Sequence, residues 1–408
     1  MPVIRFIFDG VREMFRGPRE YWIWLAVLSL VVLFGAARYS QQLTEGLVVT
    51  GMSDQVSWGF YISNFAFLVG IAAAAVLLVI PAYIFDRKDV KEVVLVGEGM
   101  AVAAVTMAIL FVIADLGRPD RLWHMIPVIG RFHWPISLLA WDVLVLSVYF
   151  LLNLAIPFYV LYSRYRGKEP NFRLYFPFVV IAMFWAISIH TVTAFLFSAN
   201  PARPFWHTAL LGPRFIASAF ASGPALIIIT LQIVRKLTSY NVSQTVIDLL
   251  ALIMTTALQI SLFFVGAELF TDFYNEGAHA ASIHYLFFGL GGFYSLKAWI
   301  WFALALNLTA VVILMIHPLR QKTLMLNIAC VLTFVGIWIE KGMGLVIPGF
   351  VPTPLGEIFE YWPTSVELAV AAAIWAFGVL IFTLLAKAVI AIEQGKLRYR
   401  AKDAMYPL

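Results

Sequence analysis

Long apolar runs recur along this chain of 408 residues, and they constrain its fold more than any other feature. A run of 18 or more apolar residues can cross roughly 30 Å of hydrocarbon as an α-helix. The chain is 62% hydrophobic and 12% charged, whereas a soluble domain carries about 25% charged residues. Segments of ~10 residues with alternating polarity, which are typical of outer-membrane barrels, are absent from the sequence. The sequence therefore predicts an all-α integral membrane protein.

Ten of these runs qualify as membrane spans. They lie at about 21–38, 58–84, 93–116, 135–162, 175–198, 213–234, 247–271, 293–316, 323–343 and 364–391. The first run is longer than the roughly 7–15-residue core of a signal peptide, so we expect it to be retained. The segment before it, VIRFIFDGVREMFR, is typical of a short amphipathic helix on the membrane surface.

Lysine and arginine are distributed unevenly between the two sides that ten spans define. With the N-terminus in the cytoplasm, 20 of the 28 Lys and Arg fall on the cytoplasmic side. The others are Arg38, Arg118, Arg121, Arg131, Arg203, Arg214, Lys297 and Lys341. We therefore expect a multi-pass protein of the cytoplasmic (inner) membrane with both termini in the cytoplasm. The net charge of +5 follows from this bias and requires no nucleic-acid partner.

Metal ligands are scarce in the sequence. Cys330 is the single cysteine, which excludes an intrachain disulfide and a cysteine-held iron–sulfur cluster. Of the seven histidines, His190 alone lies well within a predicted span, so a buried haem with two axial histidines is not expected. We expect the chain to carry no metal and no covalently bound cofactor of its own.

Short segments recur in the same order along the two halves of the chain. The pairs are FLVG (67–70) with FASG (220–223), FVIADL (111–116) with FVGAEL (264–269), SLLAW (137–141) with SLKAW (295–299), and MFWAISIH (183–190) with TFVGIWIE (333–340). They cover spans 2–5 and 6–9. Because four helices are an even number, both copies keep one orientation, which predicts two parallel-repeat four-helix bundles.

This repeat divides the chain into five parts. We expect an amphipathic cytoplasmic segment, the first span with its outer loop, the first four-helix bundle, the second four-helix bundle, and an outer loop with the tenth span and a cytoplasmic tail. Their ranges are 1–20, 21–57, 58–200, 201–343 and 344–408. The first and tenth spans would flank the two bundles.

Most ionisable residues of the spans are expected near the outer face. Such groups cost at least ~2.5 kcal/mol each inside a bilayer, so they usually face a cavity or a partner. Lys297 could form a structural ion pair with Glu268 or Glu340, and Asp115 could simply bind Arg118. The tryptophans Trp58, Trp123 and Trp134 are predicted to belong to the interfacial aromatic belt.

Two further acids are expected deeper in the membrane. Glu98 falls in the inner part of the third span, and Asp142 about two turns into the fourth span from outside. Buried carboxylates can carry protons, so Glu98, Asp142 and Asp115 are candidate stations of a proton path. Asp142 could instead be structural, bonded to Asn64 or another span. His190 is a candidate for proton exchange, for contact with a carbonyl, or for a hydrogen bond between helices.

Four stretches of the chain resemble the NrfD/PsrC family, the membrane subunits of quinone-linked oxidoreductases. They are GMSDQVSWGFYISNFAFLVG (51–70), DLGRPDR (115–121), SIHTVTAFLFSANPARPFWHTALLGPRFIASAFASG (188–223) and IEKGMGLVIPGFVPTPLGEIFEYWPTSVEL (339–368). The resemblance covers nearly the whole chain. Within the family, the ten-span form, the DQVSWG segment and the PGFVPTPLGE loop look most like the P subunits of Dsr membrane complexes (also called HmeB) of sulfate and sulfur metabolisers.

The resemblance implies a fold of two four-helix bundles that binds menaquinone, or another quinone, near the outer face. It implies that the chain has no redox cofactor and exchanges electrons with an extracytoplasmic, ferredoxin-like iron–sulfur subunit. Further implied partners are a multihaem cytochrome c, a haem b membrane subunit and a cytoplasmic iron–sulfur protein related to heterodisulfide reductase.

By motif, the resemblance locates the quinone pocket in the first bundle. The candidate ligands are Tyr61, Asn64, Asp115, Arg118, His124 and His190, with Asp115 and His190 as the candidate catalytic residues. The equivalent polar cluster of the second bundle contains Arg214, Glu268, Lys297 and Glu340. Since Lys297 stands where the first bundle has Leu139, this cluster is interpreted as charge pairing in place of ligand binding.

Quinone reduction takes two electrons and two protons, so a proton-exchanging group must lie near the carbonyls. Glu98 and Asp142 could feed protons from the cytoplasm. One alternative is a proton-coupled secondary transporter, which the absence of inverted repeats disfavours. Another is an inert anchor whose outer polar groups only bind partner subunits. Neither alternative should bind quinone. Long outer loops at 117–134, 199–213, 272–292 and 344–363 favour partner docking.

Overall fold

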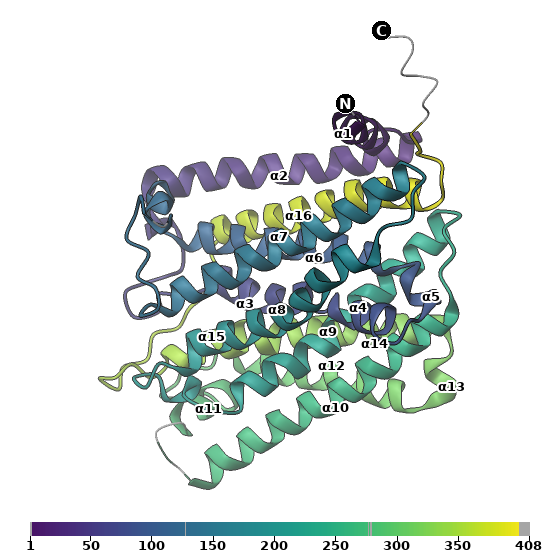
Figure 1. Ribbon diagram of the computed structural model, residues 1–408. Coiled ribbons are helices and arrows are strands. Elements are labelled where there is room, and N and C mark those ends of the chain that lie inside the picture. Colours follow the sequence, from purple (N-terminus) through teal and green to yellow (C-terminus); the bar gives the residue numbers. More distant parts are fainter. Residues whose placement is uncertain (1, 127, 276, 278–279, 400–408) are drawn as a thin grey trace.

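The structure is a computed structural model that describes residues 2–126, 128–275, 277 and 280–399. Within these residues every regular element is a helix, and a lone β-bridge joins Leu290 to Phe293. Ten helical segments are long and apolar enough to span a membrane, which confirms the predicted all-α fold with ten spans (Figure 1). Residues 400–408 of the predicted tail lie outside the described residues.

The spanning helices follow the predicted apolar runs. They are α2 (Arg19–Glu45), α3 (Phe60–Ala73) continued by α4 (Val76–Tyr83), α6 (Val94–Asp115), α7 (Leu138–Tyr165), α8 (Phe172–Ser198), α9 (Leu211–Leu237), α10 (Gln244–Asn275), α12 (Lys297–Met315), α14 (Thr323–Lys341) and α16 (Ser365–Glu393). The shorter elements are α1 (Pro2–Met14), η1 (Leu47–Val49), α5 (Lys88–Lys91), η2 (Pro119–Met125), η3 (Pro204–Trp206), α11 (Ala280–Phe287), α13 (His317–Arg320), α15 (Met343–Val346) and η4 (Pro348–Phe350).

Helix α2 extends past its predicted end at residue 38 to Glu45. The polar residues of this extension find partners on the neighbouring helix α6. The hydroxyl of Tyr39 donates to the carbonyl oxygen of Ile113 at 3.3 Å, and the amide of Gln42 donates to that of Ala114 at 2.7 Å. Polar side chains satisfied in this way allow a helix to continue beyond its apolar run.

The second span is interrupted at Ala74 and Ala75, between α3 and α4. Gly223 of α9 faces this point, since a Cβ atom at Gly223 would lie 1.9 Å from the Cβ of Ala74. Small residues let membrane helices approach closely without a gap. The close contact of Gly223 with Ala74 therefore brings α9, in the second half of the chain, against the second span, in the first half.

Two sets of four spans each form a ring of neighbours. Helix α3 packs on α6, α6 on α7, α7 on α8 and α8 back on α3; we call this set the first bundle. Helices α9, α10, α12 and α14 pack in the same order and form the second bundle. The bundles meet where α3 and α8 contact α9. That the two bundles are related by a parallel repeat stays a prediction.

Helices α2 and α16 lie together on one side of the first bundle (Figure 1). Helix α16 packs on α6 and on α2, and Gly35 of α2 lies against Ala369 and Ala373 of α16. The indole of Trp24 also donates to the hydroxyl of Thr383 at 3.3 Å. The first and tenth spans thus pair with each other beside the first bundle.

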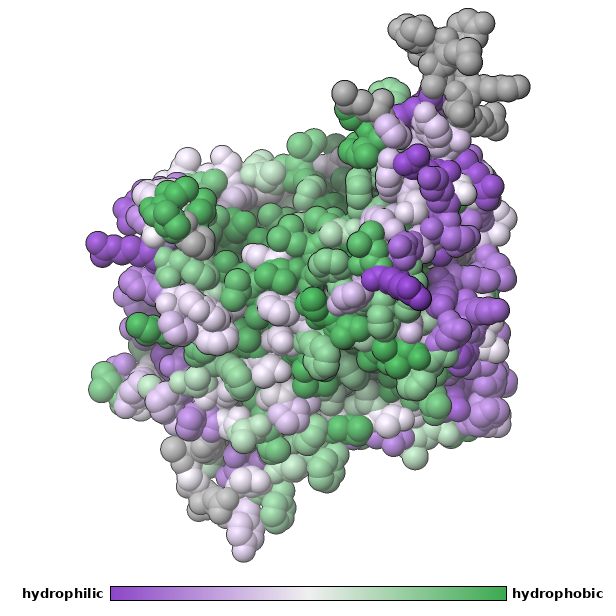
Figure 2. All heavy atoms as spheres, viewed as in Figure 1, coloured by the Kyte–Doolittle hydropathy of each residue, from purple (hydrophilic) through white to green (hydrophobic). Residues whose placement is uncertain are grey.

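Different segments of the chain lie at the two ends of the spanning helices, which we call the terminal end and the loop end. The terminal end holds α1, α5 and the last turn of α16, and the amide of Tyr399 donates there to the carbonyl of Tyr165 at 2.8 Å. The loop end holds the segments 46–59, 116–126, 128–137, 199–210 and 342–364. Figure 2 shows hydrophilic residues gathered at these ends with a hydrophobic band between them, as expected for a membrane protein.

The buried carboxylate of Glu367 connects several segments of the loop end by hydrogen bonds. Glu367 of α16 accepts hydrogen bonds from the amide of Gly51 at 2.7 Å, the hydroxyl of Tyr361 at 2.5 Å and the amide of Thr364 at 2.8 Å. The same Tyr361 hydroxyl accepts from the amide of Phe60 at 2.8 Å. These bonds hold the start of α3, and hence Tyr61, in one position.

The three tryptophans predicted for the interfacial belt differ in their surroundings. Trp123 and Trp134 are exposed at the loop end. Trp58 stacks on the buried Trp206, with ring centroids 5.7 Å apart, and packs edge-on against Phe197. The belt prediction is therefore wrong for Trp58, because segments distant in sequence fold over it and make it part of the packed loop end.

Candidate functional site

A polar group lies between α2, α3 and α6 at the loop end. The hydroxyl of Tyr61 donates to the side-chain oxygen of Gln42 at 2.8 Å, and both side chains are buried. Asp115, the last residue of α6, interacts electrostatically with Tyr61. Its Oδ1 atom is buried and has no hydrogen-bond partner among the described residues. Buried polar atoms are nearly always paired, so this oxygen is free for a hydrogen bond from a ligand.

Gln42 belongs to this group although it was not among the predicted site residues. The signal in the sequence was the pair Gln41–Gln42 at the end of a strongly apolar run. Of the two, Gln42 is 3% exposed and turned toward Tyr61. A glutamine that is buried between membrane helices needs partners on them, and only the packing of α2 on α6 reveals which ones.

Asn64, a predicted quinone ligand, has its carbonyl oxygen occupied by the protein itself. Its Oδ1 atom accepts from the indoles of Trp338 at 3.0 Å and Trp375 at 2.9 Å. Its amide nitrogen donates to the carbonyl of Phe60 at 2.8 Å. Asn64 therefore joins α3 to α14 and α16. The suggested structural bond of Asp142 to another span is formed, because Asp142 accepts from Thr193 of α8, whereas the partners of Asn64 are Phe60, Trp338 and Trp375.

Arg118 and His124 lie on the exposed surface of the loop end. Arg118 forms a two-bond ion pair with Asp120, at 2.9 Å for each bond, and its side chain is 64% exposed. The suggested pair of Arg118 with Asp115 is therefore not formed. The hydrogen bond from Arg118 lowers the pKa of Asp120 from its ordinary value. His124 stacks on Trp123 with ring centroids 3.8 Å apart.

His190 of α8 is buried in the first bundle, as expected from its position within a span. Its Nδ1 atom lies 3.3 Å from the carbonyl oxygen of Ala186, and its Nε2 atom is buried without a partner among the described residues. The ammonium group of Lys341 is near enough to act electrostatically on it. That ammonium lies 4.1 Å from the ring centroid of Phe215. The predicted site residues did not include Lys341.

Helix α7 presents a line of polar residues to the interior of the first bundle. Asp142, Tyr149 and Asn153 are all buried, and their spacing of seven and four residues repeats on one helix face. Asp142 accepts from the hydroxyl of Thr193 at 3.0 Å, and Tyr149 donates to the carbonyl of Ala72 at 3.0 Å. At 1.5 Å per residue the line extends over roughly 16 Å.

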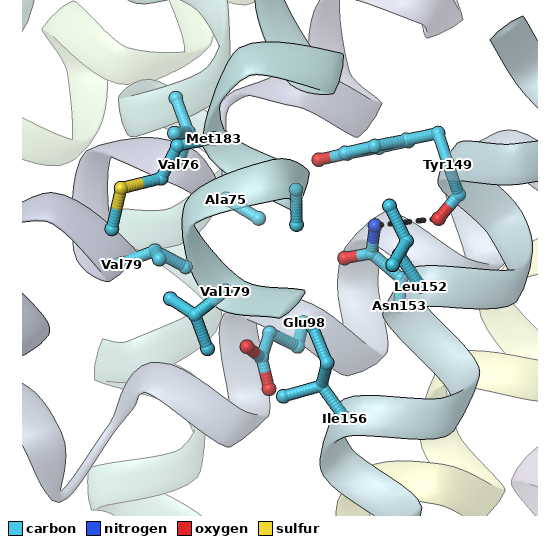
Figure 3. A pocket seen from close by; sticks show the side chains of 11 residues that line it. Ala75, Val76, Val79, Glu98, Tyr149, Leu152, Asn153, Ile156, Val179 and Met183 are labelled. Carbon is cyan, nitrogen blue, oxygen red and sulfur yellow. Dashed lines mark hydrogen bonds between the residues drawn. The ribbon is translucent and has the colours of Figure 1, made fainter. Parts of the chain in front are cut away.

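Glu98 of α6 completes this line toward the terminal end. It borders a cavity of about 20 Å³ together with Tyr149 and Asn153 (Figure 3). One oxygen of Glu98 is buried without a partner among the described residues, and the cavity is large enough for a water molecule. We call Asp142, Tyr149, Asn153 and Glu98 the polar column.

An ion pair lies where the polar column approaches the terminal end. Arg164 of α7 pairs with Glu393, the last residue of α16. Arg164 also acts electrostatically on Glu98. Charged groups therefore continue from the interior of the first bundle to its terminal surface.

The second bundle contains a different kind of polar cluster. Arg214 of α9 pairs with Glu268 of α10 and, at 3.1 Å, with Glu340 of α14. The amide of Asn307 donates to the other oxygen of Glu340 at 3.1 Å. All four side chains are buried. We call these four residues the Arg214 cluster.

Lys297 does not belong to the Arg214 cluster. It begins α12 and is exposed, and no ion pair with Glu268 or Glu340 forms in the described part of the chain. The predicted pairing is therefore wrong for Lys297. Arg214 supplies the positive charge instead, because α9 faces both α10 and α14.

Comparisons with known proteins agree on one family. The family model described as "Polysulphide reductase, NrfD" matches residues 48–352. A protein of Halobacterium salinarum that is named as a dimethyl sulfoxide reductase membrane subunit is 25% identical over 88% of both chains. The Hdr-like menaquinol oxidoreductase integral membrane subunit of Archaeoglobus fulgidus is 24% identical over 90% of this chain and 94% of its own. The menaquinone reductase integral membrane subunit of Nitratidesulfovibrio vulgaris is 23% identical over 90% of each.

Proposed function

This chain belongs to the polysulphide reductase, NrfD family, and from that premise we propose that it is the membrane subunit of a quinone-linked oxidoreductase that binds quinol or quinone at the loop end. Two relatives carry menaquinol or menaquinone in their names, which supports menaquinone as the substrate. The electrons are exchanged with a partner subunit, and this chain supplies the binding pocket and the proton-exchanging groups.

The unpartnered, buried oxygen of Asp115 is the observation that carries this proposal. A quinol hydroxyl would donate a hydrogen bond to it. When the quinol loses two electrons to the partner it also releases two protons, and a carboxylate at hydrogen-bond distance accepts the first of them. Tyr61, held by Gln42, orients the headgroup beside Asp115. Apolar helix surfaces around the group would receive the isoprenoid tail.

The pocket proposed here is smaller than the set of six predicted ligands. It keeps Tyr61 and Asp115 and adds Gln42. Asn64 is left out because its oxygen already accepts two indole hydrogen bonds. Arg118 and His124 are left out because they are exposed at the surface. His190 is kept as a second proton-exchanging group, since its Nε2 atom is buried and unpartnered among the described residues.

Orientation and partners follow from the charge distribution and the resemblance. We propose that the terminal end faces the cytoplasm and the loop end faces outward across the cytoplasmic membrane. A ferredoxin-like iron–sulfur subunit docks at the loop end. The complex would belong to sulfur or sulfate metabolism, as in Dsr complexes, with a multihaem cytochrome c, a haem b membrane subunit and a cytoplasmic heterodisulfide-reductase-like subunit as further partners.

The function is tested on the purified native complex in lipid nanodiscs. We expect quinone to co-purify with it, and menaquinol to reduce the iron–sulfur partner. An inert anchor would bind no quinone, and its partner would stay oxidised. A secondary transporter would move a solute in vesicles without any quinone. Either of these two results excludes the quinone-linked function.

The polar column is proposed as a proton route between the terminal end and the middle of the first bundle. Replacing Glu98 by Gln removes the one ionisable carboxylate that borders the cavity. When the reduced iron–sulfur partner passes two electrons to quinone, two protons are taken up, and in this direction we expect proton uptake per electron from the terminal end to fall at least about tenfold. This is less than the full 10²–10⁴-fold effect of a lost acid–base group, because water in the cavity can still pass protons.

The measurement for Glu98→Gln uses the complex in liposomes, with a pH-sensitive dye on the terminal side and electron transfer followed at the same time. Glu169→Gln is the matched control, because Glu169 is exposed on the loop after α7. An unchanged ratio of protons to electrons in Glu98→Gln excludes the polar column as the route.

A further inference from the structure

An apolar groove lies between the first and second bundles near the terminal end. Its volume is about 310 Å³, within the range of small-molecule sites in proteins. One wall comes from α4 and the residues after it, namely Leu77, Ile80, Pro81 and Phe85; the other wall comes from Leu249 and Ile253 of α10. The groove belongs to neither the quinone pocket nor the polar column.

The shape of the groove follows the direction of the helices. Leu249 and Ile253 are one turn apart on α10, as are Leu77 and Pro81 on α4, so each wall is about 6 Å long or more. Phe85 follows α4 at the terminal end. A groove that runs along the helices and has apolar walls fits an extended hydrocarbon chain.

Arg87 is the one charged residue that lines the groove. Its Nε and Nη2 atoms donate to Asp89 at 2.9 and 2.5 Å, and Asp89 accepts from the hydroxyl of Thr245 on α10 at 2.7 Å. The Arg87 hydrogen bond holds the pKa of the Asp89 carboxyl well below its ordinary value, so the pair stays charged. Within the described residues the Nη1 atom has no hydrogen-bond partner, which leaves it for an anion.

We propose that this groove binds one phospholipid of the leaflet at the terminal end. An acyl chain lies between α4 and α10, and the phosphate accepts a hydrogen bond from Nη1 of Arg87. Guanidinium–phosphate hydrogen bonds are charge-assisted and strong, and basic pockets between membrane helices bind anionic lipid headgroups. A quinone headgroup carries no negative charge for Arg87 to bind, so a quinone fits this groove less well than a phospholipid.

The bound lipid joins two helices that pack mainly on other neighbours. Helix α4 packs on α6 and α8, whereas α10 packs on α9 and α12. At the terminal end, the chain of Arg87, Asp89 and Thr245 connects them across the mouth of the groove. A phospholipid that fills the space below this connection stabilises the contact between the bundles, since empty apolar space forfeits packing energy.

The test measures phospholipid binding directly, by native mass spectrometry of the protein after detergent delipidation and titration with phosphatidylglycerol. We expect wild type to retain one tightly held lipid. Arg87→Gln should weaken its binding by about 10- to 100-fold, the loss of a charge-assisted hydrogen bond. Ile253→Trp should exclude the lipid by filling the groove.

Lys88→Gln is the matched control, because Lys88 is the adjacent, exposed cation and does not line the groove. It should bind the lipid as wild type does. Equal retention in wild type, Arg87→Gln and Ile253→Trp overturns the proposal, as does a retained quinone in place of the phospholipid. Ile253→Trp also keeps the test decisive if Arg87→Gln fails to fold.

Discussion

Replacement of Asp115 by Asn should lower quinol-dependent reduction of the iron–sulfur partner by about 10²–10⁴-fold, the range for loss of a group that exchanges protons with a reacting substrate. Asparagine keeps the size of the side chain but cannot accept the proton that the quinol releases. Its amide could still hydrogen-bond the headgroup. We therefore expect quinone to stay bound while electron transfer stops, and both quantities are measured on the assembled complex.

The control for this experiment is Asp120→Asn. Asp120 lies five residues after Asp115, is exposed and pairs with Arg118. Asp120→Asn should therefore leave the rate of quinol-dependent reduction within a factor of about two of the wild-type rate. His190→Ala serves as a second test of location. If His190→Ala abolishes quinone binding and Asp115→Asn leaves the rate unchanged, the headgroup lies against α8 and the pocket at Tyr61 and Asp115 is wrong.

Replacement of Arg214 by Met should lower the free energy of unfolding by about 3–5 kcal/mol, the cost of breaking a buried ion pair from one side. Arg214 is the cation that separates Glu268 from Glu340. Without it, two buried carboxylates face each other in a medium of low dielectric constant. Thermal unfolding of the variant in detergent measures the loss.

Two further variants make this result specific. In Arg214→Met combined with Glu268→Gln and Glu340→Gln no charge of the Arg214 cluster is left unpaired, so we expect most of the stability to return. Lys297→Met should change the unfolding free energy by less than about 0.5 kcal/mol, because Lys297 is exposed. A large loss in Lys297→Met, with none in Arg214→Met, would falsify the pairing described here.

The buried acids of the two bundles differ in whether their charges are paired. In the second bundle the acids Glu268 and Glu340 are neutralised by Arg214, and Asn307 accounts for the other oxygen of Glu340. In the first bundle Asp115 and Glu98 each retain a buried oxygen without a partner among the described residues. The acids of the second bundle are neutralised within the fold, whereas an unpaired acid can still bind a substrate or a proton, and for this reason we propose that the chemistry takes place in the first bundle.

Much of the fold was determined by the order of the amino acids alone. Whether an apolar run can span a membrane depends on its length and polarity. Both can be read from the run itself, without knowledge of the rest of the fold. For this reason all ten spans could be predicted. The positions of Asp115, His190 and Glu98 along their helices followed from their positions along those runs. A carboxylate inside such a run also needs a partner or a cavity, which is why these residues stood out.

Only the tertiary structure decided which groups meet. Which face of a helix lies against which neighbour depends on the packing of several helices at once, and side chains from 19 to 311 residues apart in the sequence become partners. Thus Asn64 meets Trp338 and Trp375, and Gln42 joins Tyr61. Arg214, rather than Lys297, reaches Glu268 and Glu340, because α9 is buried between both acids while the start of α12 stays at the surface.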